Sequence, residues 1–262
     1  RNDRVRFDLD GNTLTANADQ AYEASVIAQT SGDVAEVTIL GGGTVNATVM
    51  HVAEQAGSYG DLIVTGSGTN LSLSEALAIG GRASTFGGTG SVTVDTGASV
   101  VISSPAGNVL ETVKVFAAGT LTTNGGTVTV GSGTGETVPG TLRIYPDGNL
   151  DVRGGTLDVT TIQLSGGVIS GYGTIPTAIV ATVASNLFVP QFDDGLAGEL
   201  VLSGPISGTL TGSLTKRGDG ILLLNNSNTY TGSTTISDGL LQADDGVGLP
   251  TASTLRLRNG RL

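Results

Sequence analysis

The sequence predicts an all-β protein, a single-stranded parallel β-helix (β-solenoid) of about 10–12 coils. Three observations support this. First, glycine is abundant, with 42 Gly in 262 residues, whereas there are only 7 Pro, 5 Phe, 5 Tyr and no Trp. Second, the apolar 38% consists mainly of Val, Leu, Ile and Ala, which suits a narrow core made of many small layers. Third, short alternating apolar segments recur about every 7–8 residues, so three segments make a coil of about 20–25 residues. A disordered Gly/Ser/Thr tract would lack these recurring aliphatic pairs.

Charge and composition narrow the classes of function. The net charge of −11 and the pI near 4.3 argue against a nucleic-acid partner, because phosphate binding needs clustered Lys and Arg. An acidic surface suits solubility outside a cell and divalent cations. The chain has no Cys, and no stretch approaches 18 consecutive apolar residues, so we expect neither disulfides nor a membrane span. Since the sequence starts at Arg1 without a signal segment, we interpret it as a processed or excised exported region.

The N-terminal part contains one strand and one irregular segment. Apolar and polar residues alternate over 5–9, and a tight turn follows at 10–12. Residues 16–36 are the least strand-like and carry helix formers, so a short helical turn or cap is expected there.

From residue 37 onward, glycine-containing breaks separate the apolar segments at regular intervals. The first half contains short alternating segments at 37–39, 45–49, 62–64, 71–73, 92–94 and 100–102, and its longest loop at 74–88. Residues 113–175 form the clearest repeat, in which Leu150 and Val152 should face inward and Asp151 outward. Leu157 and Val159 should repeat this arrangement around Asp158. Prolines interrupt the alternating pattern near 176–198, so we predict a looser coil or a loop insertion there. The segment is not a domain boundary, and residues 1–262 are predicted to form one continuous domain.

Residues 214–242 carry the most specific motif. Short apolar runs alternate there with clusters of Asn, Ser, Thr and Gly, which predicts strands joined by corners. The segment resembles the autotransporter-associated β-strand repeat of bacterial surface proteins. The matching positions are Lys216, Gly218, Gly220, Leu222, Leu224, Asn228, Thr229, Tyr230, Gly232, Thr234, Ile236, Gly239 and Leu241, while Ser233 replaces a usual Gly. The resemblance implies a right-handed solenoid of the passenger type. We expect Asn228, Tyr230 and Gly232 to form a structural corner, with Gly232 at positive φ.

The residues that could carry chemistry are few. Asp151 and Asp158 lie seven residues apart, which places them on successive faces of a coil rather than opposite each other as glycoside cleavage requires. Arg153 beside them is expected on a solvated face. His51 is the only histidine, and we interpret it as a surface or packing residue. No catalytic, cofactor or metal residue is assigned.

Calcium is the one ion worth considering. The segment at 8–12 lacks the later EF-hand ligands, and 87–95 has Val92 where the calcium-binding nonapeptide needs Asp. The acidic pairs 193–194 and 244–245 are interpreted as turns at which calcium binding is an open alternative.

Two functions remain, from different classes. The first is an extracellular structural protein of a bacterial surface, a rigid stalk or filament subunit. The second is an adhesin that binds a glycan or host surface through an exposed loop such as 80–90 or 190–198. A polysaccharide-degrading enzyme is a distant third, because aromatic residues are scarce and no facing carboxylates are expected.

Both ends of the sequence have the pattern of strands, with no polar cap at the C-terminal end and only the candidate cap at 16–36 near the N-terminal end. Residues 4–10 and 255–262 alternate in strand register, and uncapped solenoid ends invite another strand. We therefore expect each end to be covered by further solenoid of the same polypeptide or by another copy, head to tail. The charged residues expected to meet at such a junction, making assembly salt-sensitive, are Arg256, Arg258 and Arg261 with Asp3, Asp8 and Asp10.

Overall fold

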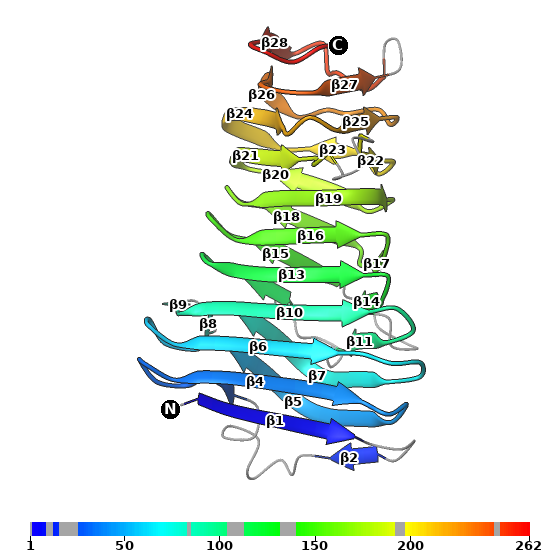
Figure 1. The fold of residues 1–262 in the computed structure, drawn as a ribbon. Coiled ribbons are helices and arrows are strands. Elements are labelled where there is room, and N and C mark those ends of the chain that lie inside the picture. Colours follow the sequence, from blue (N-terminus) through cyan, green and yellow to red (C-terminus); the bar gives the residue numbers. More distant parts are fainter. Residues whose placement is uncertain are drawn as a thin grey trace.

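The computed structural model describes residues 2–8, 13–15, 26–82, 85–103, 113–131, 140–191, 197–243 and 247–262, with side chains from Ile27 onward. The chain winds into a column of stacked strands, with the N-terminal strand at one end and the C-terminal strand at the other (Figure 1). Every ladder between named strands is parallel except the short β8–β9 hairpin, which consists of Gly81–Arg82 and Thr85–Phe86. The predicted β-solenoid is therefore confirmed.

One side of the column, which we call face 1, is an uninterrupted ladder. It contains eleven described strands, which lie one above another in Figure 1. In order they are β1 (Asn2–Asp8), β4 (Val34–Leu40), β6 (Tyr59–Val64), β10 (Thr89–Asp95), β13 (Gly119–Asn124), β16 (Asn149–Arg153), β19 (Val168–Ile175), β21 (Val183–Phe188), β24 (Thr209–Arg217), β26 (Thr231–Ile236) and β28 (Ser253–Leu257). This number of layers agrees with the predicted coil count.

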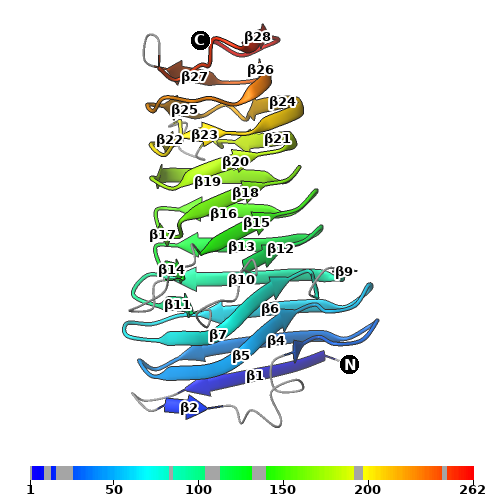
Figure 2. The same ribbon diagram turned by 180° about the vertical axis from the view of Figure 1, so that it is seen from behind.

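The remaining strands form the other two sides, seen from behind in Figure 2. Face 2 contains β2 (Thr13–Thr15), the first halves of β5 (Thr44–Val52) and β7 (Asn70–Ile79), β11 (Ser99–Ile102), β14 (Thr127–Val130), β17 (Thr156–Asp158), the second half of β19, β22 (Glu199–Leu202), β25 (Ile221–Leu224) and β27 (Leu240–Ala243). Face 3 contains β3 (Val26–Ile27), the second halves of β5 and β7, β12 (Val113–Val115), β15 (Thr141–Ile144), β18 (Thr161–Leu164), β20 (Ala178–Ala181) and β23 (Ile206–Ser207).

Coil length is not constant along the column. On face 1, Leu121 pairs with Leu150, whereas Leu150 pairs with Ile169, so the second coil is much shorter than the first. The predicted coil length of about 20–25 residues is close to that of the shorter coils. It is wrong for the longer coils. The extra residues of the longer coils fall between strands, at the β8–β9 hairpin and at segments outside the described residues, such as 104–112 and 132–139.

The core is a stack of aliphatic side chains. Leu121, Leu150 and Ile169 succeed one another in one inward row, and each is fully buried. Leu150 and Val152 point inward as predicted, and exposed Asp158 lies between buried Leu157 and Val159. Such a core has no single centre. Each layer is covered only by the layers above and below it, which makes stability a nearest-neighbour property.

The two segments expected to be irregular contain strands where they are described. Residues 16–25 lie outside the described part of the chain, while residues 26–27 and 34–36 belong to β3 and β4. The segment 176–198 contains β20 and β21, and its residues 192–196 lie outside the described part.

Candidate functional site

The segment 214–243 runs from the end of β24 through β25 and β26 to β27, and four of its residues bring polar groups or strained backbone into the solenoid. Lys216 is the most unusual of them. It occupies the inward row of face 1, between Leu187 and Ile236, and it is 1% exposed. Its Nζ donates hydrogen bonds to the carbonyl oxygens of Gly218 and of Asp238, the latter 3.3 Å away, so the ammonium group joins the corners of two successive coils. Burial lowers the pKa of Lys216 to about 8, although Asp238 and Asp219 nearby oppose the shift.

Asn228 replaces part of a ladder with its side chain. Face 3 has its last described strand at β23, and the next coil passes this position without a described strand. The Asn228 Oδ1 accepts a hydrogen bond from the Ile206 backbone N–H at 2.7 Å, and its Nδ2 donates to the Gly248 carbonyl at 2.7 Å. A buried side-chain amide thus satisfies backbone groups of the coils on both sides, as a peptide group in a strand would.

Tyr230 fills the interior behind this corner. Its side chain is fully buried, and its hydroxyl lies 2.6 Å from the Thr234 Oγ1, which in turn lies 2.9 Å from the Ser253 Oγ. Burial raises the pKa of the Tyr230 phenol, while the hydrogen bonds from Thr234 and Ser253 oppose this shift. The ring supplies the volume that aliphatic side chains supply elsewhere, and the hydroxyl chain links it to the following coil.

Gly232 has the positive φ that the sequence predicts, at 107°. It lies inside β26 rather than in a turn, opposite a register shift between Thr209 and Ser213 of β24. A Cβ at this position would lie 2.8 Å from the Gly212 carbonyl oxygen, so both the backbone angle and the close approach of the neighbouring strand require glycine.

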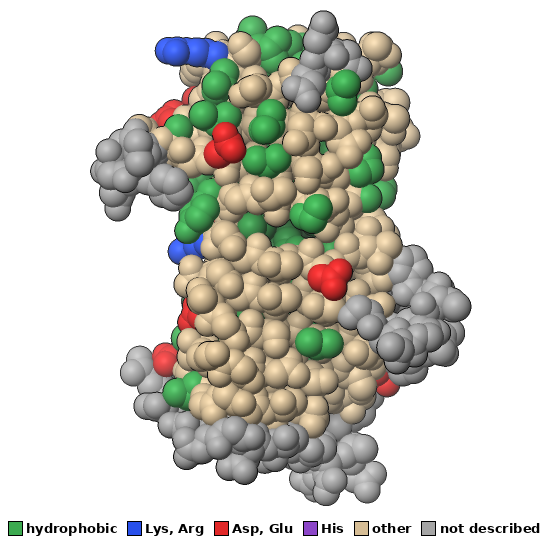
Figure 3. All heavy atoms as spheres, turned by 90° about the vertical axis from the view of Figure 1, so that its right-hand side faces the viewer, with side chains coloured by type: hydrophobic (Ala, Val, Ile, Leu, Met, Phe, Trp, Pro, Cys, Tyr) green, Lys and Arg blue, Asp and Glu red, His purple; other side chains and the backbone are tan. Residues whose placement is uncertain are grey.

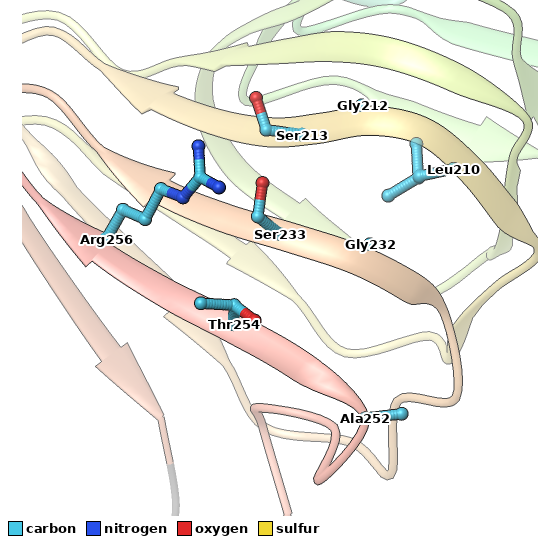
Figure 4. A pocket seen from close by; sticks show the side chains of 8 residues that line it. All are labelled: Leu210, Gly212, Ser213, Gly232, Ser233, Ala252, Thr254 and Arg256. Carbon is cyan, nitrogen blue, oxygen red and sulfur yellow. The ribbon is translucent and has the colours of Figure 1, made fainter.

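A shallow groove lies on the outer surface of face 1, over β24, β26 and β28. Its volume is about 540 Å³, and its lining residues are Leu210, Gly212, Ser213, Gly232, Ser233, Ala252, Thr254 and Arg256. Figure 4 shows the Arg256 side chain extending towards Ser233 and Ser213. The hollow follows from glycines and short side chains, and among these described lining residues only Arg256 is charged.

His51 lies in β5 and is 9% exposed, so it is a packing residue. Its Nδ1 lies 4.0 Å from the Oε2 of buried Glu54, and Glu54 also pairs with Arg82 at 2.8 Å. Desolvation lowers the pKa of His51, while the Glu54 carboxylate opposes the shift.

The predicted loop at 80–90 is anchored to the solenoid. Arg82, in the β8–β9 hairpin, makes the ion pair with Glu54. Phe86, in the same hairpin, packs edge-on against Phe116 and Tyr145, whose rings stack on each other with centroids 4.7 Å apart. No pattern in the sequence indicates this packing, because the three rings are far apart in the chain.

The carboxylates considered for catalysis lie on different faces. Asp151 is in β16 of face 1 and Asp158 is in β17 of face 2. Arg153 pairs with Asp151, its Nη2 and Nε lying 2.7 and 2.8 Å from the Asp151 Oδ2. Within the described ranges, no group of three or more His, Asp or Glu side chains is placed to hold a metal ion. The acidic pairs 193–194 and 244–245 lie outside those ranges.

The residues predicted for an end-to-end junction are only partly described. Asp3 and Asp8 belong to β1, of whose side chains nothing is described, and Asp10 lies outside the described residues. Arg258 and Arg261 are exposed at the other end of the column. The predicted junction therefore stays a prediction. Among the described residues, no helix is long and apolar enough to cross a bilayer.

Comparison with known proteins identifies one segment. Residues 214–243 match the passenger-associated-transport-repeat family, which supports the resemblance to autotransporter passenger repeats in this segment. Neither the curated proteins nor the solved structures contain a significant match. The matched segment is the one in which Lys216, Asn228, Tyr230 and Gly232 are buried or conformationally restricted.

Proposed function

We propose that the chain is part of an exported bacterial surface protein of the autotransporter type, in which the solenoid serves as a rigid shaft. The observation that carries this proposal is the unbroken face 1 ladder, which joins β1 to β28 through parallel pairing. The passenger-type repeat within the same ladder supports export to the cell surface.

The construction suits a mechanical role. The backbone groups of each coil bond to the coils above and below, so bending or opening the column breaks several hydrogen bonds at once. The side of the column seen in Figure 3 carries mostly uncharged polar side chains and backbone, with scattered hydrophobic side chains and few charged groups among the described residues. A shaft needs neither a catalytic group nor a bound metal. We therefore propose a non-enzymatic protein, consistent with the burial of His51 and the separation of Asp151 from Asp158.

We further propose that the shaft extends by stacking, on more coils of the same polypeptide or on another copy. In β28, Leu257 continues the inward row of Ile236 but is 55% exposed. Another coil stacked on β28 would bury this side chain, and burial of a leucine contributes about 1.5–3 kcal/mol.

The shaft is tested by electron microscopy and limited proteolysis of the purified chain. We expect rods about 50 Å long, from about ten steps of about 4.8 Å, that resist cleavage within the described strands from β10 to β24. Compact round particles, or rapid cleavage within this ladder, would contradict the proposal.

Stacking between copies is tested by analytical ultracentrifugation at low and high salt. Self-association should be weakened by Leu257→Asp and retained in the control Thr254→Asp, since Thr254 lines the side groove rather than the end. A chain that stays monomeric at high concentration and low salt would rule out stacking between copies and leave continuation within one polypeptide.

A further inference from the structure

The outer surface of face 1 carries a second groove, in the middle of the column. It is lined by residues of β13, β16, β19 and β21, together with Pro190 just beyond β21, and its volume is about 430 Å³. This volume falls in the range of small-ligand sites, about 300–1,000 Å³. The groove lies where the coils shorten, since the steps from Leu150 to Ile169 and from Ile169 to Leu187 are both shorter than the step that leads to Leu150.

Two outward rows of side chains meet in this groove. Pairing between strands places Asp151, Ser170 and Phe188 in one row. The same pairing places Arg153 opposite Tyr172 in the next row. The groove therefore combines charged groups, hydroxyls and aromatic rings that come from three successive coils.

The polar groups are held in fixed positions. Asp151 belongs to the outward row yet is only 8% exposed, because Arg153 and Ser170 cover it. Its Oδ2 accepts hydrogen bonds from Arg153, and its Oδ1 accepts one from the Ser170 hydroxyl at 3.2 Å. The Arg153 side chain remains 54% exposed, so part of its guanidinium faces the solvent. Groups fixed in this way lose little conformational freedom when a ligand binds.

An aromatic ring stands beside these polar groups. Phe188 is 41% exposed, although it follows buried Leu187 in β21. Gly171 lies in the lining, and its φ of 106° and closeness to the Val152 carbonyl exclude a side chain there. The part of the groove next to Ser170 is therefore bare backbone.

We propose that this groove binds a carbohydrate, a short stretch of a glycan chain lying across β16, β19 and β21. A pyranose ring has an apolar C–H face that can lie on the Phe188 ring, and hydroxyls around its edge that can bond to the Arg153 guanidinium, which buried Asp151 holds in place. An apolar ligand does not fit a lining that contains an ion pair, and a polyanion such as nucleic acid is disfavoured by the net charge of −11. The proposal does not depend on the mechanical role of the shaft, and it places binding on the ladder itself rather than on a loop.

The test uses the complete chain and a glycan array that includes cellobiose, chitobiose, lactose and digalacturonate. Sugars that bind are then titrated by ligand-observed NMR. We expect at least one sugar to bind, and Phe188→Ser and Arg153→Gln each to weaken its binding about tenfold or more, the range of a central contact residue. The controls are Tyr59→Ser, which removes an aromatic residue of face 1 that is 57% exposed, and Arg258→Gln; both should bind like the parent.

Two outcomes would overturn the proposal: no glycan of the array binds the parent chain, or Phe188→Ser binds as tightly as the parent. The Phe188 variant keeps the test decisive if Arg153→Gln disturbs folding, because the partly exposed ring can be removed without opening the core. Melting curves of each variant show which of them remain folded.

Discussion

The coils from β10 to β16 and the coils from β24 to β28 build the same column in two ways. In the first region Val92, Leu121 and Leu150 succeed one another at long, equal intervals, and this inward row is aliphatic. The adjacent inward row contains one polar side chain, the buried Thr123. In the second, Leu214, Thr234 and Leu255 succeed one another at shorter intervals, and polar groups enter the interior. The long coils have strands on all three faces, whereas the coil that follows β24 has no described strand on face 3.

The difference shows how a coil without a third strand can be accommodated. Short length alone does not require this, since the short coil that contains β16, β17 and β18 has strands on all three faces. A coil that omits a strand leaves backbone donors and acceptors of its neighbours without ladder partners, and buried groups of this kind must be satisfied. Asn228 does this with its side-chain amide, which bonds to backbone groups of the coils on both sides. Lys216 has a different role, because its ammonium group joins carbonyl groups at the corners of two successive coils. The recognisable repeat in the sequence therefore marks the place where side chains replace a regular ladder.

The largest effect is expected from the aliphatic core of the long coils. Leu150 lies between Leu121 and Ile169, so Leu150→Ala removes contacts on both sides and should cost about 4 kcal/mol in the free energy of unfolding. The matched change Leu214→Ala should cost about 2 kcal/mol, because Leu214 lies between Ser185 and Thr234. Denaturant titrations measure both values. Equal losses would show that the two regions do not differ in their cores.

Asn228 provides the corresponding test in the repeat. Asn228→Ala leaves the Ile206 N–H and the Gly248 carbonyl buried without their partner, which should cost about 3 kcal/mol. Asn226→Ala is the control and should cost about 1 kcal/mol, because it removes a single partly buried bond to the Ser203 carbonyl. If calorimetry found the same loss for both variants, Asn228 would not replace a ladder.

Gly232 tests the close approach of two strands in the short coils. Gly232→Val should lower stability by about 2 kcal/mol, since a β-branched residue is strained at this φ and its Cβ approaches the Gly212 carbonyl. Ser233→Val, one position along the same strand, should change stability by less than about 0.5 kcal/mol. Thermal melting of the two variants under the same conditions decides the matter, and equal melting temperatures would contradict the assignment.

The sequence was sufficient to predict the architecture, because three features agree: short period-2 segments that recur regularly, a core composition poor in aromatic residues, and the resemblance of 214–242 to a passenger repeat. The resemblance to the passenger repeat also directed attention to Asn228, Tyr230 and Gly232 as a corner, although Gly232 lies inside β26 rather than in a turn. The grooves could not be predicted. Asp151 and Phe188 are far apart in the chain, and they line the same groove because the parallel register places both in one row with Ser170, which depends on where each corner falls. The aromatic packing of Phe86 on Phe116 and Tyr145 could not be predicted either, because the three rings are far apart in the chain.

The last expected effect concerns the protonation of Lys216, a buried titratable group of the second region. Because burial lowers the pKa of Lys216 from 10.5 to about 8, the unfolded chain binds more protons at this group between these pH values. Stability should therefore rise as the pH increases from about 8. Tyr230 acts in the opposite direction above pH 10, where its raised pKa makes the folded chain bind more protons.

The parent chain should accordingly show a stability maximum near pH 10, measured by urea denaturation across the pH range. Lys216→Met fills the same inward position without a titratable group, so the rise between pH 8 and 10 should disappear while the decline above pH 10 remains. If the variant kept the rise, another group would be responsible for it. Lys216 would then stabilise the short coils through its hydrogen bonds to Gly218 and Asp238 and not through a change in its protonation.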